Sequence, residues 1–226
     1  MLVNPIIQGA KQNITFTNAG YFQYPAEVEI PANVTKLPSN TNGMNGHSEI
    51  EKITFAPNSL FSGVNSAYAF CACTGLEEIS LPASLTTIAN DMFTGCSSLE
   101  ELEIPSGVTT VMNSAFKNCT ALKKLEYKGI PTSTYFTKTD GANPIASCTA
   151  LEQIIVPTGW NQDIVISTGG YAWTNVLTHD SLVAMIANLY DYSGGTAHIL
   201  TLGDTNLARL SADEIAVATV KNWTLS

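Results

Sequence analysis

The stretch Met92–Pro105, MFTGCSSLEELEIP, decides the fold of this chain, because its pattern returns at a fixed distance along the sequence. Its cysteine, Cys96, lies midway between Cys73 and Cys119, and Cys148 follows after a longer interval. That longer interval equals one period plus a short insertion. The spacing defines a period of about 23 residues, and self-similarity at about 20–29 residues predicts stacked coils, in which each coil buries its apolar face against its neighbours.

Apolar residues recur at the same offsets from each of these cysteines. Leucine stands at the third following position, Ile or Leu at the sixth, and Leu, Ile, Tyr or Val at the eighth. The alternation between the sixth and eighth positions predicts a half-buried strand. The ninth residue is proline in three of the four repeats, and proline ends a strand because it lacks an N–H group. Weaker repeats place His47 and Phe22 at the cysteine position, which makes six strand segments in all.

The element in Met92–Pro105 recurs in Ala115–Tyr127 with its phenylalanine, cysteine and leucines in place. It resembles the BspA-like leucine-rich repeats of bacterial surface proteins, and the resemblance covers residues 22–157. The resemblance implies an α/β fold, a leucine-rich-repeat solenoid with a parallel sheet on its concave face and an irregular convex side. The chain departs from the pattern at the insertion Lys128–Ser147 and in lacking a phenylalanine before Cys148.

The two ends of the chain leave the repeat, and we expect three parts. Residues 1–21 form an N-terminal strand or hairpin, residues 22–160 form about six coils, and residues 161–226 form a small helix-strand-helix cap. Terminal coils of a solenoid need such protection from solvent. The segment Leu177–Ser226 also resembles a C-terminal module in leucine-rich-repeat proteins of gut bacteria and their phages, which implies a cap and no known activity.

Helical spacing and capping signals predict the elements of this cap. Apolar residues at helical spacing within Thr178–Tyr190 predict a helix that begins at Thr178 or Asp180. His198–Leu202 is typical of a strand. Ser211 and Glu214 form the pattern of a capping box, which predicts a second helix to about Lys221.

Composition argues against several classes of function. The chain has 226 residues, of which 45% are hydrophobic and only 13% are charged. Ten Lys and Arg against 19 Asp and Glu give a net charge of −9 with no basic run, which argues against nucleic-acid binding and against a polybasic membrane surface. No apolar stretch approaches the roughly 20 residues that span a bilayer. The opening residues, Met1–Ala10, do not have the pattern of a signal peptide.

No motif in the sequence predicts catalysis. The pair Cys71 and Cys73 lacks the two-residue spacer of a zinc knuckle. We therefore expect Cys73, Cys96, Cys119 and Cys148 to be small buried side chains and Cys71 alone to be exposed. The three histidines have no nucleophile motif beside them, and a catalytic triad assembled in space is the remaining alternative. We expect no catalytic residue, no metal ligand and no cofactor.

Acidic residues gather at the outward positions of the predicted strands, which hold ten of the 19 acids. Stacked strands lie about 4.8 Å apart, so these carboxylates form columns on one face. Lys52, Lys123 and Lys124 relieve part of the repulsion. One interpretation is a solvated sheet face, and the other is a surface that binds a basic partner or, weakly, a divalent cation. The binding residues that we expect on this face are Glu78, Ser80, Glu101, Glu103, Lys124 and Glu126.

The insertion Lys128–Ser147 adds Tyr135 and Phe136 to the candidate binding residues. Insertions in solenoids often lie at the binding face. Exposed aromatic rings there could stack on a sugar or pack on a protein partner, and they could equally cover the neighbouring coil.

The leading functional hypothesis is a non-enzymatic binding and adhesion module on a bacterial cell, which recognises a host protein or glycan through its concave face. The alternative is a structural or receptor-binding component of a phage or prophage tail, favoured by the missing signal pattern and the C-terminal resemblance. The expected location is extracellular or on the cell surface, or else in the virion. The expected partners are a host or bacterial protein or glycan and a weakly bound divalent cation, without nucleic acid or a membrane span.

Overall fold

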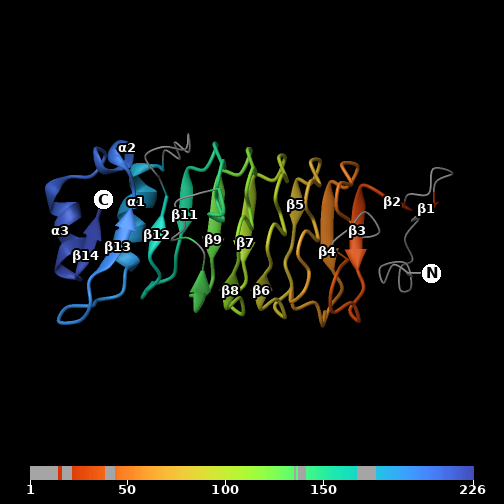
Figure 1. Cartoon of the computed structure of the whole chain (residues 1–226), viewed down its shortest axis with the longest axis horizontal. Coiled ribbons are helices and arrows are strands. Elements are labelled where there is room, and N and C mark those ends of the chain that lie inside the picture. Colours follow the sequence, from red (N-terminus) through yellow and green to blue (C-terminus); the bar gives the residue numbers. More distant parts are fainter. Residues whose placement is uncertain (1–14, 17–21, 39–43, 135, 137–140, 167–176) are drawn as a thin grey trace.

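The repeats stack into an elongated solenoid in the computed structural model of the chain, with strands side by side along its length (Figure 1). The structure describes residues 15–16, 22–38, 44–134, 136, 141–166 and 177–226. Each coil is numbered by the strand that it adds to one side of the solenoid. The six are β3 (Glu27–Ile30), β4 (Lys52–Phe55), β5 (Glu78–Ile79), β7 (Glu101–Ile104), β9 (Lys124–Tyr127) and β11 (Gln153–Ile155).

These strands confirm the six predicted segments and are paired in parallel. β3, β4 and β5 form one sheet, and β7, β9 and β11 form another, with equivalent repeat positions opposite each other. Burial alternates as predicted in β3 and β7, where Val28 and Leu102 are buried while Glu27 and Glu101 are exposed. The alternation gives the solenoid one apolar interior and one polar face.

The interior is a set of columns that run through successive coils. Phe70 and Phe93 stack with ring centroids 5.2 Å apart, and Phe93 and Phe116 stack at 5.9 Å. All three rings are fully buried. Burying a Phe side chain contributes about 1.5–3 kcal/mol, so a single column supplies a large share of the stability between coils.

The cysteines form a second column beside the phenylalanines, which confirms their predicted burial. The Sγ atoms of Cys96, Cys119 and Cys148 each donate to the phenylalanine carbonyl of the preceding coil at 3.1 Å. Cys73 donates to the carbonyl of Met44 at 2.8 Å. Burial raises the pKa of Cys73 to about 12, which keeps this thiol protonated as a donor. Cys71 is half-buried and stands outside the column.

A left-handed residue precedes the cysteine position in five coils. Gly46, Ala72, Gly95, Asn118 and Ser147 have φ angles between 56° and 81°. In four of them the backbone N–H donates to a carbonyl of the next coil at 2.7–2.8 Å. The left-handed conformation therefore turns the chain and links neighbouring coils.

A second parallel sheet lies on another side of the solenoid, where the repeat resemblance implied irregular structure. Its strands are β6 (Thr87–Ile88), β8 (Thr110–Val111) and β10 (Ser133–Thr134), paired in the order β10-β8-β6. Each strand has two residues, and β6 and β8 each add one buried β-branched side chain. The coils are thus held by hydrogen bonds on two sides.

The C-terminal part continues the stack with helices and a further sheet. Strands β12 (Ile164–Val165), β13 (His198–Thr201) and β14 (Trp223–Leu225) are parallel, and three helices accompany them: α1 (His179–Asn188), α2 (Asp204–Leu207) and α3 (Ala212–Val220). Thr178 caps α1 and Ser211 with Glu214 forms a capping box on α3, which confirms both predicted helices. Near the other end, β1 (Thr15–Phe16) and β2 (Phe22–Gln23) pair in antiparallel orientation.

Helix α1 lies where a seventh strand would otherwise pair with β11. The backbone N–H of Ile154 donates to Ser181 Oγ at 3.1 Å, and the N–H of Thr178 donates to the carbonyl of Glu152 at 2.8 Å. These contacts satisfy groups that an open sheet edge would leave unpaired. Among the described residues, none of the helices has the length and apolar character needed to cross a bilayer.

Candidate binding surface

The outward side chains of the six strands form one polar surface, which we call the acidic strand face. It carries glutamate on every coil and lysine on the second and fifth. Its residues are Glu27, Glu29, Glu51, Lys52, Glu77, Glu78, Ser80, Glu100, Glu101, Glu103, Lys123, Lys124, Glu126 and Glu152. The parallel register places equivalent positions of neighbouring coils opposite each other, so that charges of successive coils interact across the sheet.

Lysines pair with glutamates across several junctions, as the sequence predicted. Lys52 Nζ lies 2.7 Å from Glu78, Lys123 Nζ lies 2.9 Å from Glu100, and Lys124 Nζ lies 3.9 Å from Glu101. These side chains are largely exposed, so each pair is worth only about 0–1 kcal/mol.

Lys128 adds a fourth cation that the sequence analysis did not include. It contacts Glu126 within coil 5 and Glu103 of coil 4, the latter at 3.2 Å. Lys124 Nζ lies 3.0 Å from the other oxygen of Glu126. Hydrogen bonds from Lys128 and Lys124 lower the pKa of Glu126. Coils 4 and 5 therefore share a compact network of opposite charges.

A regular backbone ladder joins the coils along this face at four of the five junctions. Two successive N–H groups of the later coil donate to one carbonyl of the earlier coil, at 2.7–3.2 Å. The accepting carbonyls belong to Ala26, Glu51, Glu100 and Lys123, which occupy the same position in their repeats.

The ladder is open between coils 3 and 4. The equivalent carbonyl there is that of Glu77, and neither Glu100 nor Glu101 donates its backbone N–H to it, although the structure describes all three residues. Strands β5 and β7 accordingly belong to separate sheets. The rest of the junction is closed: Ala72 N–H donates to the Thr94 carbonyl at 2.7 Å, and β6 pairs with β8.

Charge distinguishes this junction from the other four. Glu77 and Glu100 occupy equivalent positions, and so do Glu78 and Glu101, so two of the three outward columns bring like charges together. At the other junctions at least one of the two columns pairs a lysine with a carboxylate or an amide, or contains an uncharged residue. Like charges directly opposite each other destabilise strand pairing. We attribute the open ladder to this repulsion.

A surface hollow of about 770 Å³ coincides with the open ladder. Its lining residues come from coils 3, 4 and 5: Glu77, Glu78, Ile79, Ser97, Ser98, Glu100, Glu101 and Ala121. Ile79 keeps 8% of its surface exposed, whereas the equivalent Ile53 and Leu125 keep none. A small part of the Ile79 side chain is therefore accessible at the base of the hollow.

The structure brings six of the predicted binding residues together. Coil 3 contributes Glu78 and Ser80, coil 4 contributes Glu101 and Glu103, and coil 5 contributes Lys124 and Glu126. A second, smaller hollow is lined by Ile79, Glu101, Leu102, Glu103, Lys124 and Glu126. Sequence reasoning identified the columns of charge, but not the interruption of the ladder between them.

The insertion contributes differently from what was expected. Phe136 is 1% exposed and its ring lies 6.1 Å from that of Tyr127 in an edge contact, so it covers the neighbouring coil and is not available to a ligand. Buried Asn143 fixes the backbone of Phe136, because its Nδ2 group donates to the Phe136 carbonyl at 3.1 Å. The prediction that Phe136 is a binding residue was therefore wrong. Tyr135 lies outside the described residues.

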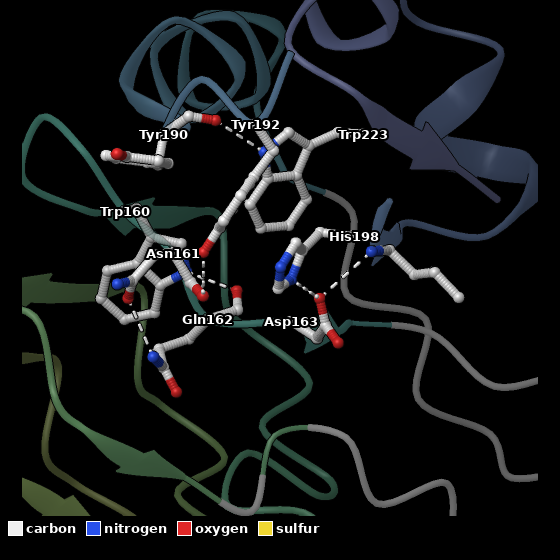
Figure 2. A network of polar contacts seen from close by, with 9 residues as sticks. Trp160, Asn161, Gln162, Asp163, Tyr190, Tyr192, His198 and Trp223 are labelled. Carbon is white, nitrogen blue, oxygen red and sulfur yellow. Dashed lines mark hydrogen bonds and ion pairs between the residues drawn. The ribbon is translucent and has the colours of Figure 1, made fainter. Parts of the chain in front are cut away.

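A second polar site, which the sequence did not reveal, lies between coil 6 and the C-terminal sheet (Figure 2). We call it the aromatic cluster, and it consists of Asn161, Gln162, Asp163, Tyr190, Tyr192 and His198 over the buried rings of Trp160 and Trp223. Tyr192 stacks on His198 with centroids 3.9 Å apart and meets Tyr190 edge to face at 4.8 Å. These residues come from separate segments, so no sequence motif joins them.

Hydrogen bonds fix the polar groups of the aromatic cluster. Asp163 Oδ1 accepts from the backbone N–H of Ile199 at 3.1 Å and lies 2.8 Å from His198 Nδ1. Gln162 Nε2 donates to Asn161 Oδ1 at 2.8 Å. Tyr190, which meets Tyr192, remains 49% exposed. The cluster thus contains an exposed aromatic ring, an amide and a carboxylate.

Metal-binding geometry is absent from the part of the chain that the structure describes: no group of three His, Cys, Asp or Glu side chains there could hold a metal ion. The buried thiols act as hydrogen-bond donors in the interior. The described surface offers charged groups, hydrogen-bonding groups and an exposed aromatic ring.

The BspA type leucine rich repeat region matches this chain in six copies, over residues 15–135 and 64–172. No curated protein matches it.

Solved bacterial leucine-rich-repeat structures are similar. The T. pallidum leucine rich repeat protein is 15% identical with a TM-score of 0.57, and the match covers 95% of each chain. A leucine rich cell surface protein from Faecalibacterium prausnitzii is 23% identical (TM-score 0.45), with 63% of this chain and 37% of that chain covered. A leucine-rich repeat protein from Bacteroides ovatus is 17% identical (TM-score 0.44), with 87% and 59% covered. This chain therefore spans less than two thirds of the last two, and the T. pallidum likeness shows the fold alone.

Proposed function

The chain belongs to the BspA type leucine rich repeat family, and from that premise we propose that it is a non-enzymatic adhesion module on a bacterial surface. Its partner is a host protein that presents a basic patch to the acidic strand face. One observation carries the proposal: six parallel strands expose glutamates on one side, and a hollow lined by four of these glutamates lies near the centre of the face. The negative electrostatic potential of such a face attracts a positively charged partner and repels acidic proteins.

The dimensions of the face suit a protein partner. Six strands at a spacing of about 4.8 Å extend over about 24 Å. A standard interface buries about 800 Å² on each partner, so a protein partner would also contact surface beside these short strands. Three of the four glutamates that line the hollow already pair with a lysine, and among the described residues there Glu77 is the glutamate without an ion pair.

The proposal predicts that charge reversal at the centre of the face abolishes binding. Glu101→Lys combined with Glu103→Lys should reduce capture of basic proteins from a mucosal extract at least tenfold, measured by quantitative mass spectrometry of the bound fraction. The matched control, Glu27→Lys with Glu152→Lys, changes the net charge equally at the two ends of the face. Equal capture by the central and control variants would refute the proposal.

A glycan is the second candidate partner, and the aromatic cluster favours it. Pyranose rings stack their apolar C–H faces on exposed aromatic side chains, and their hydroxyls bond to amides and carboxylates. Tyr190 offers an exposed aromatic ring, and Asn161 and Asp163 of the same cluster offer an amide and a carboxylate (Figure 2).

Tyr190→Ala should therefore remove any signal that the chain gives on a glycan array, while Tyr190→Phe should retain most of it. The exposed Val220→Ala, which lies on α3, serves as a control. An array signal that survives Tyr190→Ala would exclude the aromatic cluster as the glycan site.

A further inference from the structure

We infer that the junction between coils 3 and 4 is a charge-controlled seam, at which β5 and β7 pair only when the repulsion between their glutamates is removed. The seam is open at low ionic strength and closes in salt, which joins the two three-stranded sheets of the strand face into one. The inference concerns the fold of this face and stands whether or not a basic protein binds there.

The ion pairs of the strand face divide it into two blocks. Lys52 pairs with Glu78 and thereby ties coil 2 to coil 3. Lys123, Lys124 and Lys128 each pair with a glutamate of coil 4, which ties coil 5 to coil 4. Among the residues that the structure describes, no ion pair joins coil 3 to coil 4. The lysines therefore compensate the glutamates from outside the seam and leave like charges opposite each other across it.

Only a small movement is needed to close the seam, because the rest of the junction already has the normal coil spacing. Phe70 stacks on Phe93 with ring centroids 5.2 Å apart, and β6 pairs with β8. The carbonyl of Glu77 corresponds to the one that accepts two N–H groups at each of the other junctions. The N–H groups of Glu100 and Glu101 are the matching donors. Closure therefore adds two backbone hydrogen bonds and leaves the buried columns in place.

Two opposing contributions of similar size decide whether the seam is open. Two backbone hydrogen bonds at the surface favour closure only modestly, because water bonds to the same groups when the seam is open. Two columns of like charges directly opposite each other disfavour it. Salt shifts this balance, because the Debye length falls from about 10 Å at 0.1 M to about 3 Å at 1 M, which is shorter than the strand spacing of about 4.8 Å.

Hydrogen exchange at single amides of the full chain tests the inference. In low salt, the amides of Glu100 and Glu101 should exchange at least tenfold faster than those of Lys123 and Lys124, which donate to the Glu100 carbonyl at the next junction. In about 1 M NaCl this ratio should fall at least fivefold, because the charges are screened and the seam closes. The amide of Ala72, on the turn side of the same junction, should exchange at the same rate in both solutions.

Glu77→Gln combined with Glu78→Gln closes the seam without salt, because it removes the like charges from one of its two sides. We expect it to slow exchange at Glu100 and Glu101 in low salt at least tenfold. The matched control, Glu27→Gln with Glu152→Gln, removes the same charge at the two ends of the face and should leave the seam open.

Lys52→Glu transfers the charge pattern of the seam to the junction between coils 2 and 3, where Glu77 and Glu78 would then both lie opposite a glutamate. Exchange at these two amides should rise at least tenfold in low salt and recover in about 1 M NaCl. The amide of Gly46 donates to the Cys71 carbonyl on the turn side of that junction and should be unaffected.

Several outcomes would overturn the inference. Exchange at Glu100 and Glu101 as slow as at Lys123 and Lys124 in low salt would mean that the ladder is already closed. A ratio that neither salt nor the neutralised variant changes would mean that charge does not control the seam. Faster exchange at the turn-side amides together with the strand amides would mean that whole coils loosen, which also contradicts a seam.

Discussion

Residues with positive φ hold the turns of this solenoid, and only some of them are glycine. Gly46 and Gly95 occupy the position before the cysteine in two coils, while Ala72, Asn118 and Ser147 occupy it in three others. A residue with a Cβ atom loses about 1–2 kcal/mol when it adopts this conformation. The inter-coil hydrogen bonds that these residues donate, such as Ala72 N–H to the Thr94 carbonyl, compensate for the strain.

Ala72→Gly should therefore stabilise the protein, by about 0.5–1 kcal/mol, because glycine relieves the strain at φ 56° but is more flexible in the unfolded chain. Thermal and urea unfolding followed by circular dichroism would measure it. Ala121→Gly is the matched control at a position without positive φ and should destabilise by a similar amount. If both substitutions changed the free energy of unfolding in the same direction, the result would contradict backbone strain at Ala72.

At the scale of strands, charges determine which neighbours pair. The network of Glu126 with Lys124 and Lys128 links coils 4 and 5, whereas like charges separate coils 3 and 4. Both junctions have the same repeat register and the same buried columns. The difference between a closed and an open ladder thus follows from outward residues, which do not enter the hydrophobic pattern.

The lowered pKa of Glu126 makes stability depend on pH. A carboxyl whose pKa is lower in the folded than in the unfolded state stabilises the fold above its unfolded value of about 4.3, and this contribution is lost as pH falls through the folded value. Glu126→Gln should lower stability by about 0.5–1 kcal/mol at pH 7 and reduce the loss between pH 6 and pH 3. Urea titrations at each pH would measure both effects. Glu152→Gln, an outward glutamate of coil 6, is the control.

The sequence predicted the elements that carry a periodic signal and missed those that do not. The six strands and both longer helices follow from hydrophobic spacing and capping residues, and the cysteine column follows from the repeat. The second sheet was missed because a two-residue strand such as Thr87–Ile88 is too short for a period to be visible. The aromatic cluster was missed because Asp163, Tyr192 and His198 meet only in space.

The open ladder was missed for a different reason. Its cause, glutamates in both columns of coils 3 and 4, can be read from the sequence, and the repulsion in these columns was recognised. Whether the strands pair depends on the balance between charge repulsion and coil stacking. Each cross-strand side-chain pair contributes only about 0.2–1 kcal/mol, and a sequence pattern does not give these energies.

For the molecule as a whole, the main liability is the edge at each end of the stack. At coil 6, Ser181 of helix α1 and its N-cap Thr178 form hydrogen bonds with backbone groups at the edge of β11. Exposed strand edges template pairing between chains, and solenoids need polar terminal caps for solubility.

A chain that ends after residue 166 should therefore self-associate, because it exposes the edge of β11 and the apolar surface that Leu182 and Met185 cover. Sedimentation velocity should show oligomers for this truncated chain and a lighter species for the full chain. Ser181→Ala is a milder version that leaves α1 in place and should cost about 1 kcal/mol without association. A truncated chain that sediments as a folded monomer would argue against the capping role.

The missing strand pairing between β5 and β7 also has a mechanical consequence. As the proposed adhesion module, the chain would bear tensile load when a bound host surface moves, and a rod bends first where one face lacks cross-links. Here that face lies between β5 and β7, so we expect the rod to flex there before it flexes at other junctions of the strand face. A pulling trace should begin with a small extension at low force.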